Sequence, residues 1–142
     1  MIGIITSIIA GAAMSLQGVF NTRLSEKAGL FESNAFVQTV ACVLSIIVML
    51  IFGKGNIKAI AEVNKLYLLG GVLGIIITVT VMLGIKDLSP VFSIAIILIS
   101  QLTVAAVIDA FGLFETEKIP FGLTKYIGIA LMIAGVVVFK IK

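Results

Sequence analysis

The sequence predicts an all-α integral membrane protein with five transmembrane helices. Hydrophobic residues make up 61% of the 142 residues and charged residues only 12%. An ordinary soluble domain carries about 25% charged residues, because its surface meets water. The charges also fall between uncharged stretches that are long enough to cross a bilayer. A chain this short cannot bury so much apolar side-chain area by itself, whereas a bilayer accommodates it.

The positions of the charged residues delimit the spans. The first four spans follow uncharged stretches of about 20 residues, the length that an α-helix needs to cross a hydrocarbon core of roughly 30 Å. The fifth reaches this length if its helix begins near Pro120, with Lys125 directed toward the headgroups. We expect one membrane domain, residues 1–142, with helices at 2–22, 33–53, 66–86, 90–112 and 121–140.

The connections between the spans are short. Residues 23–32 join the first two spans, and Gly29 is the expected helix stop. Residues 54–65 form the longest linker, in which 58–62 are expected to make a short helical turn at the membrane surface. Residues 86–90 form a minimal hairpin.

Several functional classes are excluded by residues that the sequence lacks. It has no histidine and one cysteine, Cys42, so it offers neither a disulfide framework nor a metal-ligand set. The net charge of +3 is too diffuse for a nucleic-acid surface. No Gly-rich phosphate loop or nucleophile–base pair is visible. We therefore expect no metal, no cofactor, no nucleic-acid partner and no enzymatic activity.

The distribution of Lys and Arg gives no preferred orientation. With five spans, one membrane face receives five cations, and so does the other: Lys54, Lys58, Lys65, Lys118 and Lys125 against Arg23, Lys27, Lys86, Lys140 and Lys142. Orientation normally follows an excess of Lys and Arg on the cytoplasmic side. The balance predicts insertion in both orientations and pairing as an antiparallel homodimer of ten helices. The alternative is that span hydrophobicity selects one orientation.

Small residues at regular spacing predict close helix packing. Gly70 and Gly74 form a small-xxx-small face, and Gly128 and Gly135 lie a heptad apart. Small side chains let helix backbones approach closely in lipid, where no hydrophobic effect drives association. The predicted packing positions are Gly11, Gly18, Gly70, Gly74, Gly128 and Gly135.

Any binding chemistry must come from the few polar side chains inside the spans. These recur at helical i,i+4 spacing: Gln17 with Asn21, Asn34 with Gln38, and Gln101 with Asp109 through Ala105. A carboxylate inside a membrane helix costs between ~2.5 and more than ~10 kcal/mol unless it is hydrated or paired. Asp109 is therefore the principal candidate for a substrate-binding or coupling residue.

Structural interpretations of the same residues remain open. The amides are also suited to hydrogen bonds between helices, worth about 1 kcal/mol each. Asp109 is close enough to its helix end to lie in the headgroup region, paired with Lys118 or Lys125.

Two segments carry a resemblance to a known family. The first is Gly11-x5-Gln17-x3-Asn21-x2-Leu24 followed by Gly29, and the second runs from Gln101 through Asp109 to Gly112. Together with Pro120, Gly128 and Gly135, they resemble the YdcZ-like family of small inner-membrane proteins over essentially the whole chain. That family often has histidine after the aspartate, where this chain has Ala110, which puts in doubt any mechanism needing an imidazole there.

The resemblance implies membership of the drug/metabolite transporter superfamily, whose larger members have ten spans in two inverted halves. This chain then looks like one half, located in the bacterial inner membrane. We expect secondary transport of a small polar or cationic metabolite by alternating access. Asp109 would bind a proton or a substrate cation, while Gln101, Gln17, Asn21 and Gln38 supply hydrogen bonds.

Two other classes of function stay open. A small multidrug or cation exporter is also short and inserts in both orientations, but the related exporters place a key glutamate in the first helix, which has none here. A membrane accessory or assembly subunit needs no aqueous cavity. It would tolerate apolar replacement of Gln17, Gln101 and Asp109.

Overall fold

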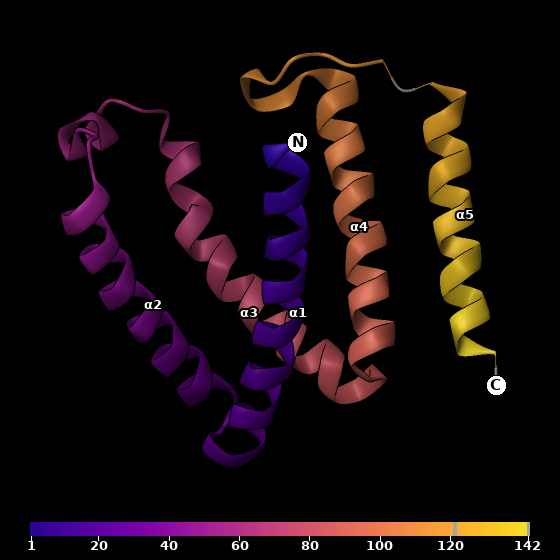
Figure 1. The fold of residues 1–142 in the computed structure, drawn as a ribbon, viewed down its shortest axis with the longest axis horizontal. Coiled ribbons are helices and arrows are strands. Elements are labelled where there is room, and N and C mark those ends of the chain that lie inside the picture. The colour runs from indigo at the N-terminus through magenta and orange to yellow at the C-terminus, as the bar shows by residue number, and fades with distance from the viewer. Residues whose placement is uncertain (121, 142) are drawn as a thin grey trace. The chain divides into compact units, whose positions relative to one another are not determined.

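The computed structural model describes residues 1–120 and 122–141, in which every regular element is helical. Five helices are long and apolar enough to cross a membrane, which confirms that part of the predicted fold. They are α1 (Ile2–Ala28), α2 (Leu30–Phe52), α3 (Gly70–Leu88), α4 (Pro90–Phe111) and α5 (Leu123–Lys140) (Figure 1). The chain divides into two compact units, Met1–Asp87 and Leu88–Lys142.

In the first unit, α1 and α2 form a helical hairpin with a single connecting residue, Gly29. Helix α1 continues to Ala28 rather than ending at residue 22, and Arg23 and Glu26 form a salt bridge of 3.1 Å in its last turns. Charge therefore marks where the helix leaves the hydrocarbon and not where the helix ends. Gly29 has φ 98°, a backbone conformation that favours glycine, and α2 begins directly after it.

The linker between α2 and α3 contains two short 3₁₀ helices, η1 (Ile57–Ala61) and η2 (Lys65–Leu69). Each is preceded by an asparagine whose side-chain oxygen accepts a backbone hydrogen bond: Asn56 from Lys58 N at 3.0 Å, and Asn64 from Leu66 N at 3.1 Å. Such caps satisfy helix-terminal N–H groups. The short helical turn expected at 58–62 is present as η1.

Side chains from the second half of α3 lie against Gly18 of α1. A Cβ added at Gly18 would lie 2.9 Å from Ile85 Cδ1 and 3.1 Å from Val81 Cγ1. Met82 and Ile85 are the most buried apolar side chains of this region, 1% and 5% exposed. A glycine on α1 thus provides the space into which α3 packs.

The second unit is the antiparallel hairpin of α4 and α5. Pro90 opens α4, after Ser89 with φ 92°, and Gly112 ends it in the left-handed conformation at φ 63°. The short η3 helix (Leu113–Glu115) follows, and the chain then returns so that Ile119 N donates to Asp109 O at 2.9 Å. The predicted start of the fifth span, residue 121, lies outside the described residues, and α5 is described from Leu123.

The far end of this hairpin is closed by a cation–π contact. Lys140 Nζ, in the last turn of α5, lies 5.5 Å from the centroid of the Phe92 ring, in the first turn of α4. Contacts of this kind contribute ~0.5–2 kcal/mol. The opposite end of the hairpin, where α4 ends and α5 begins, is where the candidate site lies.

The described chain leaves most of its apolar surface uncovered. At most 11% of the residues in the most apolar window of any span are buried. Large side chains such as Phe36, Leu50 and Leu131 are more than half exposed. A soluble protein could not tolerate this surface, but lipid or another membrane helix can cover it.

Candidate functional site

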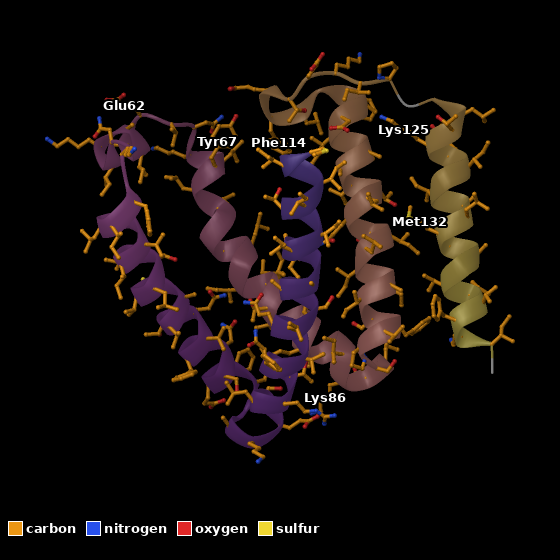
Figure 2. All side chains as sticks on the ribbon, viewed as in Figure 1. Glu62, Tyr67, Lys86, Phe114, Lys125 and Met132 are labelled. Carbon is orange, nitrogen blue, oxygen red and sulfur yellow. The ribbon has the colours of Figure 1, made fainter. Side chains whose placement is uncertain are left out.

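A cavity of about 290 Å³ lies between α4 and α5. Its walls carry two charged side chains, Asp109 from α4 and Lys125 from α5. The remaining lining residues are apolar or small: Leu102, Ala105, Ala106, Gly128, Ile129 and Met132. Figure 2 shows Lys125 and Met132 on the side of α5 that faces α4. Pockets for drug-sized ligands usually occupy ~300–1,000 Å³, so this cavity suits a small molecule.

Both charges of the cavity lie at one end of the hairpin. Asp109 belongs to the last turn of α4 and Lys125 to the first turn of α5, and antiparallel helices bring these two ends together. A carboxylate is disfavoured at a helix C-terminus, and an ammonium group is disfavoured at a helix N-terminus. Neither residue therefore stabilises its own helix. Each charge is complementary to the charge and the helix end on the opposite side of the cavity.

The Asp109 carboxylate is half-buried and has no hydrogen bond or salt bridge to a described residue. No salt bridge joins Asp109 to Lys118 among the described residues. Lys125 shares its cavity, whereas Lys118 lines a neighbouring and mainly apolar cavity of about 710 Å³. A carboxylate inside a membrane helix is costly unless it is hydrated or paired, and a bound cation would supply such a partner.

The local fold holds Asp109 in place through its backbone. The Asp109 carbonyl accepts hydrogen bonds from Gly112 N at 3.4 Å and Ile119 N at 2.9 Å. The loop after α4 is therefore tied to this residue, and the carboxylate stays on the cavity side of the helix. A Cβ at Gly112 would lie 3.3 Å from both Lys118 Cβ and Thr116 O, so this tight return also requires glycine.

The polar residues of the first unit make a different, uncharged arrangement. Gln38 Nε2 donates to Thr78 Oγ1 at 3.2 Å, which joins α2 to α3, and Thr78 Oγ1 donates to Gly74 O at 2.8 Å. Asn21 on α1 and Asn34 on α2 are 7% and 8% exposed. The structure thus uses at least Gln38 as a link between helices.

Two buried oxygens in this unit lack a partner among the described residues, Ser33 Oγ and Asn34 Oδ1. A buried polar atom without a hydrogen bond costs about 1–3 kcal/mol. Such atoms are usually satisfied by water or by a ligand.

The remaining candidate amides, Gln17 and Gln101, are exposed on the described chain. Gln101 lies on α4 but does not line the cavity that contains Asp109. An amide group facing hydrocarbon costs several kcal/mol without a hydrogen bond. Their exposure leaves both side chains accessible to a polar neighbour outside the described chain. Gln17, Asn21 and Gln38 belong to the first unit, and Gln101 and Asp109 belong to the second.

The six glycines predicted for packing differ in their surroundings. Gly18 lies against α3, and a Cβ at Gly74 would approach Gln38 Nε2 at 4.0 Å. The other four have nothing within 4 Å of the position that a Cβ would occupy: Gly11, Gly70, Gly128 and Gly135. Gly128 lines the cavity instead. For these four, a role in helix packing stays a prediction that needs a neighbour outside this chain.

Three residues of these sites were not predicted as site residues. Lys125 was expected to reach toward the headgroups, Thr78 is an ordinary span residue, and Ser33 begins the second uncharged stretch. The signal available for Lys125 was that it follows Pro120 at the start of a span, where an acid is the favourable charge. Nothing in the local sequence distinguishes Thr78 or Ser33.

A comparison with protein families identifies the chain. The model of a family described as "Putative inner membrane exporter, YdcZ" matches residues 2–138. No curated protein and no solved structure matches the chain. The family match agrees with the five candidate spans. The chain therefore belongs to the YdcZ family and is a multi-pass protein of the inner membrane.

Proposed function

We propose that the protein is a secondary active exporter of a small polar or cationic metabolite, working by alternating access as an antiparallel homodimer. The family description supports export and favours a transporter over an enzyme. The observation that carries the proposal is the half-buried Asp109 carboxylate, which has no partner among the described residues and lines a cavity between two membrane helices. This group binds a proton or a substrate cation in turn, which couples the two movements.

The homodimer is supported by three features of the chain. The Lys and Arg residues are balanced between the two membrane faces, so neither orientation is favoured. Gln17 and Gln101 are exposed polar groups that need a neighbour in the membrane. Four of the predicted packing glycines have open space beside them. A second, inverted copy supplies both a polar neighbour and a close-packed surface.

The test is proton movement in proteoliposomes that contain a pH-sensitive dye. An imposed gradient of choline, a cation, or L-leucine, a zwitterion, should move protons through the wild-type protein. Asp109→Asn should abolish this movement, because the amide binds neither a proton nor a cation as a charge partner. Asp87→Asn is the matched control, since Asp87 is an exposed carboxylate in the other unit. Equal proton movement in wild-type and Asp109→Asn vesicles would overturn the proposal.

Dimer topology is tested separately with an impermeant maleimide on intact cells. A cysteine replaces Ile141, at the end of the described chain, in a Cys42→Ala background. Labelling of about half of the molecules is expected if both orientations coexist. Labelling of all or none would exclude a self-paired inverted dimer and direct the search to an oppositely oriented partner chain.

A further inference from the structure

The geometry of the α4–α5 cavity points to a substrate class: a small zwitterion with an apolar side chain, as in an apolar α-amino acid. This inference rests on the proposed export function, because it identifies what the same cavity binds. Asp109 pairs with the ammonium group of the substrate and Lys125 pairs with its carboxylate. The apolar walls hold the side chain.

The charges of the cavity favour a zwitterion over a simple cation or anion. The lining contains one carboxylate and one ammonium group and no other charged side chain among the described residues. A cation is attracted by Asp109 but repelled by Lys125, and an anion meets the reverse situation. A zwitterion interacts favourably with both, and hydrogen bonds between charged groups are about twice as strong as neutral ones.

The helix ends set the orientation of the zwitterion. The C-terminus of α4 presents carbonyl oxygens with partial negative charge, which favour a cation beside Asp109. The N-terminus of α5 presents N–H groups with partial positive charge, which favour an anion beside Lys125. The backbone dipoles and the two side chains therefore prefer the same arrangement of the substrate charges.

The shape of the cavity favours a short substrate that has an apolar end. Leu102 precedes Asp109 and Met132 follows Lys125 by about two helical turns each, so the apolar end lies about 10 Å from the charged end. Ala105 and Gly128 keep the space between these ends open. A volume of about 290 Å³ is large enough for an amino acid.

The experiment compares three probes that share one apolar side chain. Binding of radiolabelled L-leucine to the purified full-length protein is measured in maltoside micelles, with competition by L-leucine methyl ester and by N-acetyl-L-leucine. The ester is only a cation and the acetyl derivative only an anion. We expect L-leucine to bind about tenfold more tightly than either derivative.

Variants of the two charged residues should change this preference in opposite directions. Asp109→Asn should lose most of its affinity for L-leucine and shift toward N-acetyl-L-leucine, and Lys125→Gln should shift toward the ester. The double reversal Asp109→Lys/Lys125→Asp should recover part of the L-leucine binding, because the two charges are again opposite. If either residue had a purely structural role, the reversal would not recover binding. Lys118→Gln is the matched control, since Lys118 lines only the neighbouring cavity.

The outcomes separate this inference from the proposed function. Equal affinity for L-leucine and its ester, unchanged in Lys125→Gln, would overturn the zwitterion assignment, while Asp109-dependent proton movement with choline would leave the export function standing. L-leucine binding without Asp109-dependent proton movement would support the zwitterion assignment and overturn the proposed export function. Loss of L-leucine binding in nanodiscs containing phosphatidylethanolamine, but not in those containing phosphatidylglycerol alone, would show that a zwitterionic lipid occupies the site and would also overturn the assignment.

Discussion

The two units of the chain place their polar residues in different surroundings. In the first unit the charged residues of the helices lie near helix ends, the buried polar residues are uncharged, and one pair, Gln38 and Thr78, joins two helices. In the second unit the polar residues of the cavity are charged, and the half-buried Asp109 carboxylate has no partner among the described residues. Buried amides and hydroxyls stabilise a helix pair at modest cost, whereas charges in a membrane persist only where function needs them. We infer that the first unit is built mainly to pack and the second mainly to bind.

The largest effect is expected from filling the cavity of the second unit without disturbing its fold. Gly128→Leu places a side chain where nothing lies within 4 Å of the added Cβ, in the wall of the cavity. L-leucine binding should fall by more than about tenfold. The free energy of unfolding in mixed micelles should not decrease, because leucine favours helix over glycine. Gly135→Leu, on the same helix with open space but outside the cavity lining, is the control and should bind normally.

The complementary change overpacks the first unit. Gly18→Leu inserts a side chain against Ile85 and Val81, whose atoms already lie within about 3 Å of an added Cβ. The free energy of unfolding should decrease by about 2–3 kcal/mol, the usual cost of overpacking. Gly11→Leu is the control on the same helix, since nothing lies within 4 Å of its Cβ position. A similar stability for both variants would show that α1 does not pack on α3 through Gly18.

Smaller effects are expected at the single-residue turns that precede α2 and α4, one in each unit. Gly29 and Ser89 have nearly the same backbone, with φ 98° and 92° and ψ 154° in both. Gly29→Ala should destabilise the protein by about 1–2 kcal/mol, because this conformation is strained for any residue with a Cβ. Ser89→Gly should stabilise it by about 1 kcal/mol for the same reason. Unfolding in mixed micelles measures both changes.

The loss of stability expected for Gly29→Ala has a second cause, which a double variant separates from the backbone strain. An added Cβ there would also collide with Glu32 Oε2, so part of the cost belongs to that side chain. The double variant Gly29→Ala/Glu32→Ala should remain destabilised if the backbone conformation dominates. Full recovery of stability in the double variant would assign the effect to Glu32 instead.

Much of the fold was predictable because a bilayer imposes a simple rule. Apolar stretches of about 20 residues must become helices that satisfy their own backbone hydrogen bonds, so the positions of charges such as Lys54 and Lys86 locate the spans. Helix ends were less predictable. Helix α1 continues to Ala28 beyond its uncharged stretch, because Arg23, Glu26 and Lys27 are good helix formers outside the hydrocarbon as well.

Part of the candidate site was also predictable. Asp109 is recognisable in the sequence because an acid inside a span is rare and costly. Its neighbour in the cavity, Lys125, was assigned to the headgroup region, since a lysine near a span end usually extends toward water. Whether it does so depends on which face of α5 carries it, and that face is set by the packing of α5 on α4.

Hydropathy and charge along the chain are enough to establish a helical protein with five candidate spans, and the residue pattern is enough to assign it to the YdcZ family of the inner membrane. They suffice because lipid acts on each segment separately. The arrangement of the helices was needed to show that Asp109 and Lys125 face one cavity, that Gln38 bonds to Thr78, and that Gly18 receives α3. These pairings join residues on different helices, and the rotation of each helix about its axis follows from side-chain packing that no single segment contains.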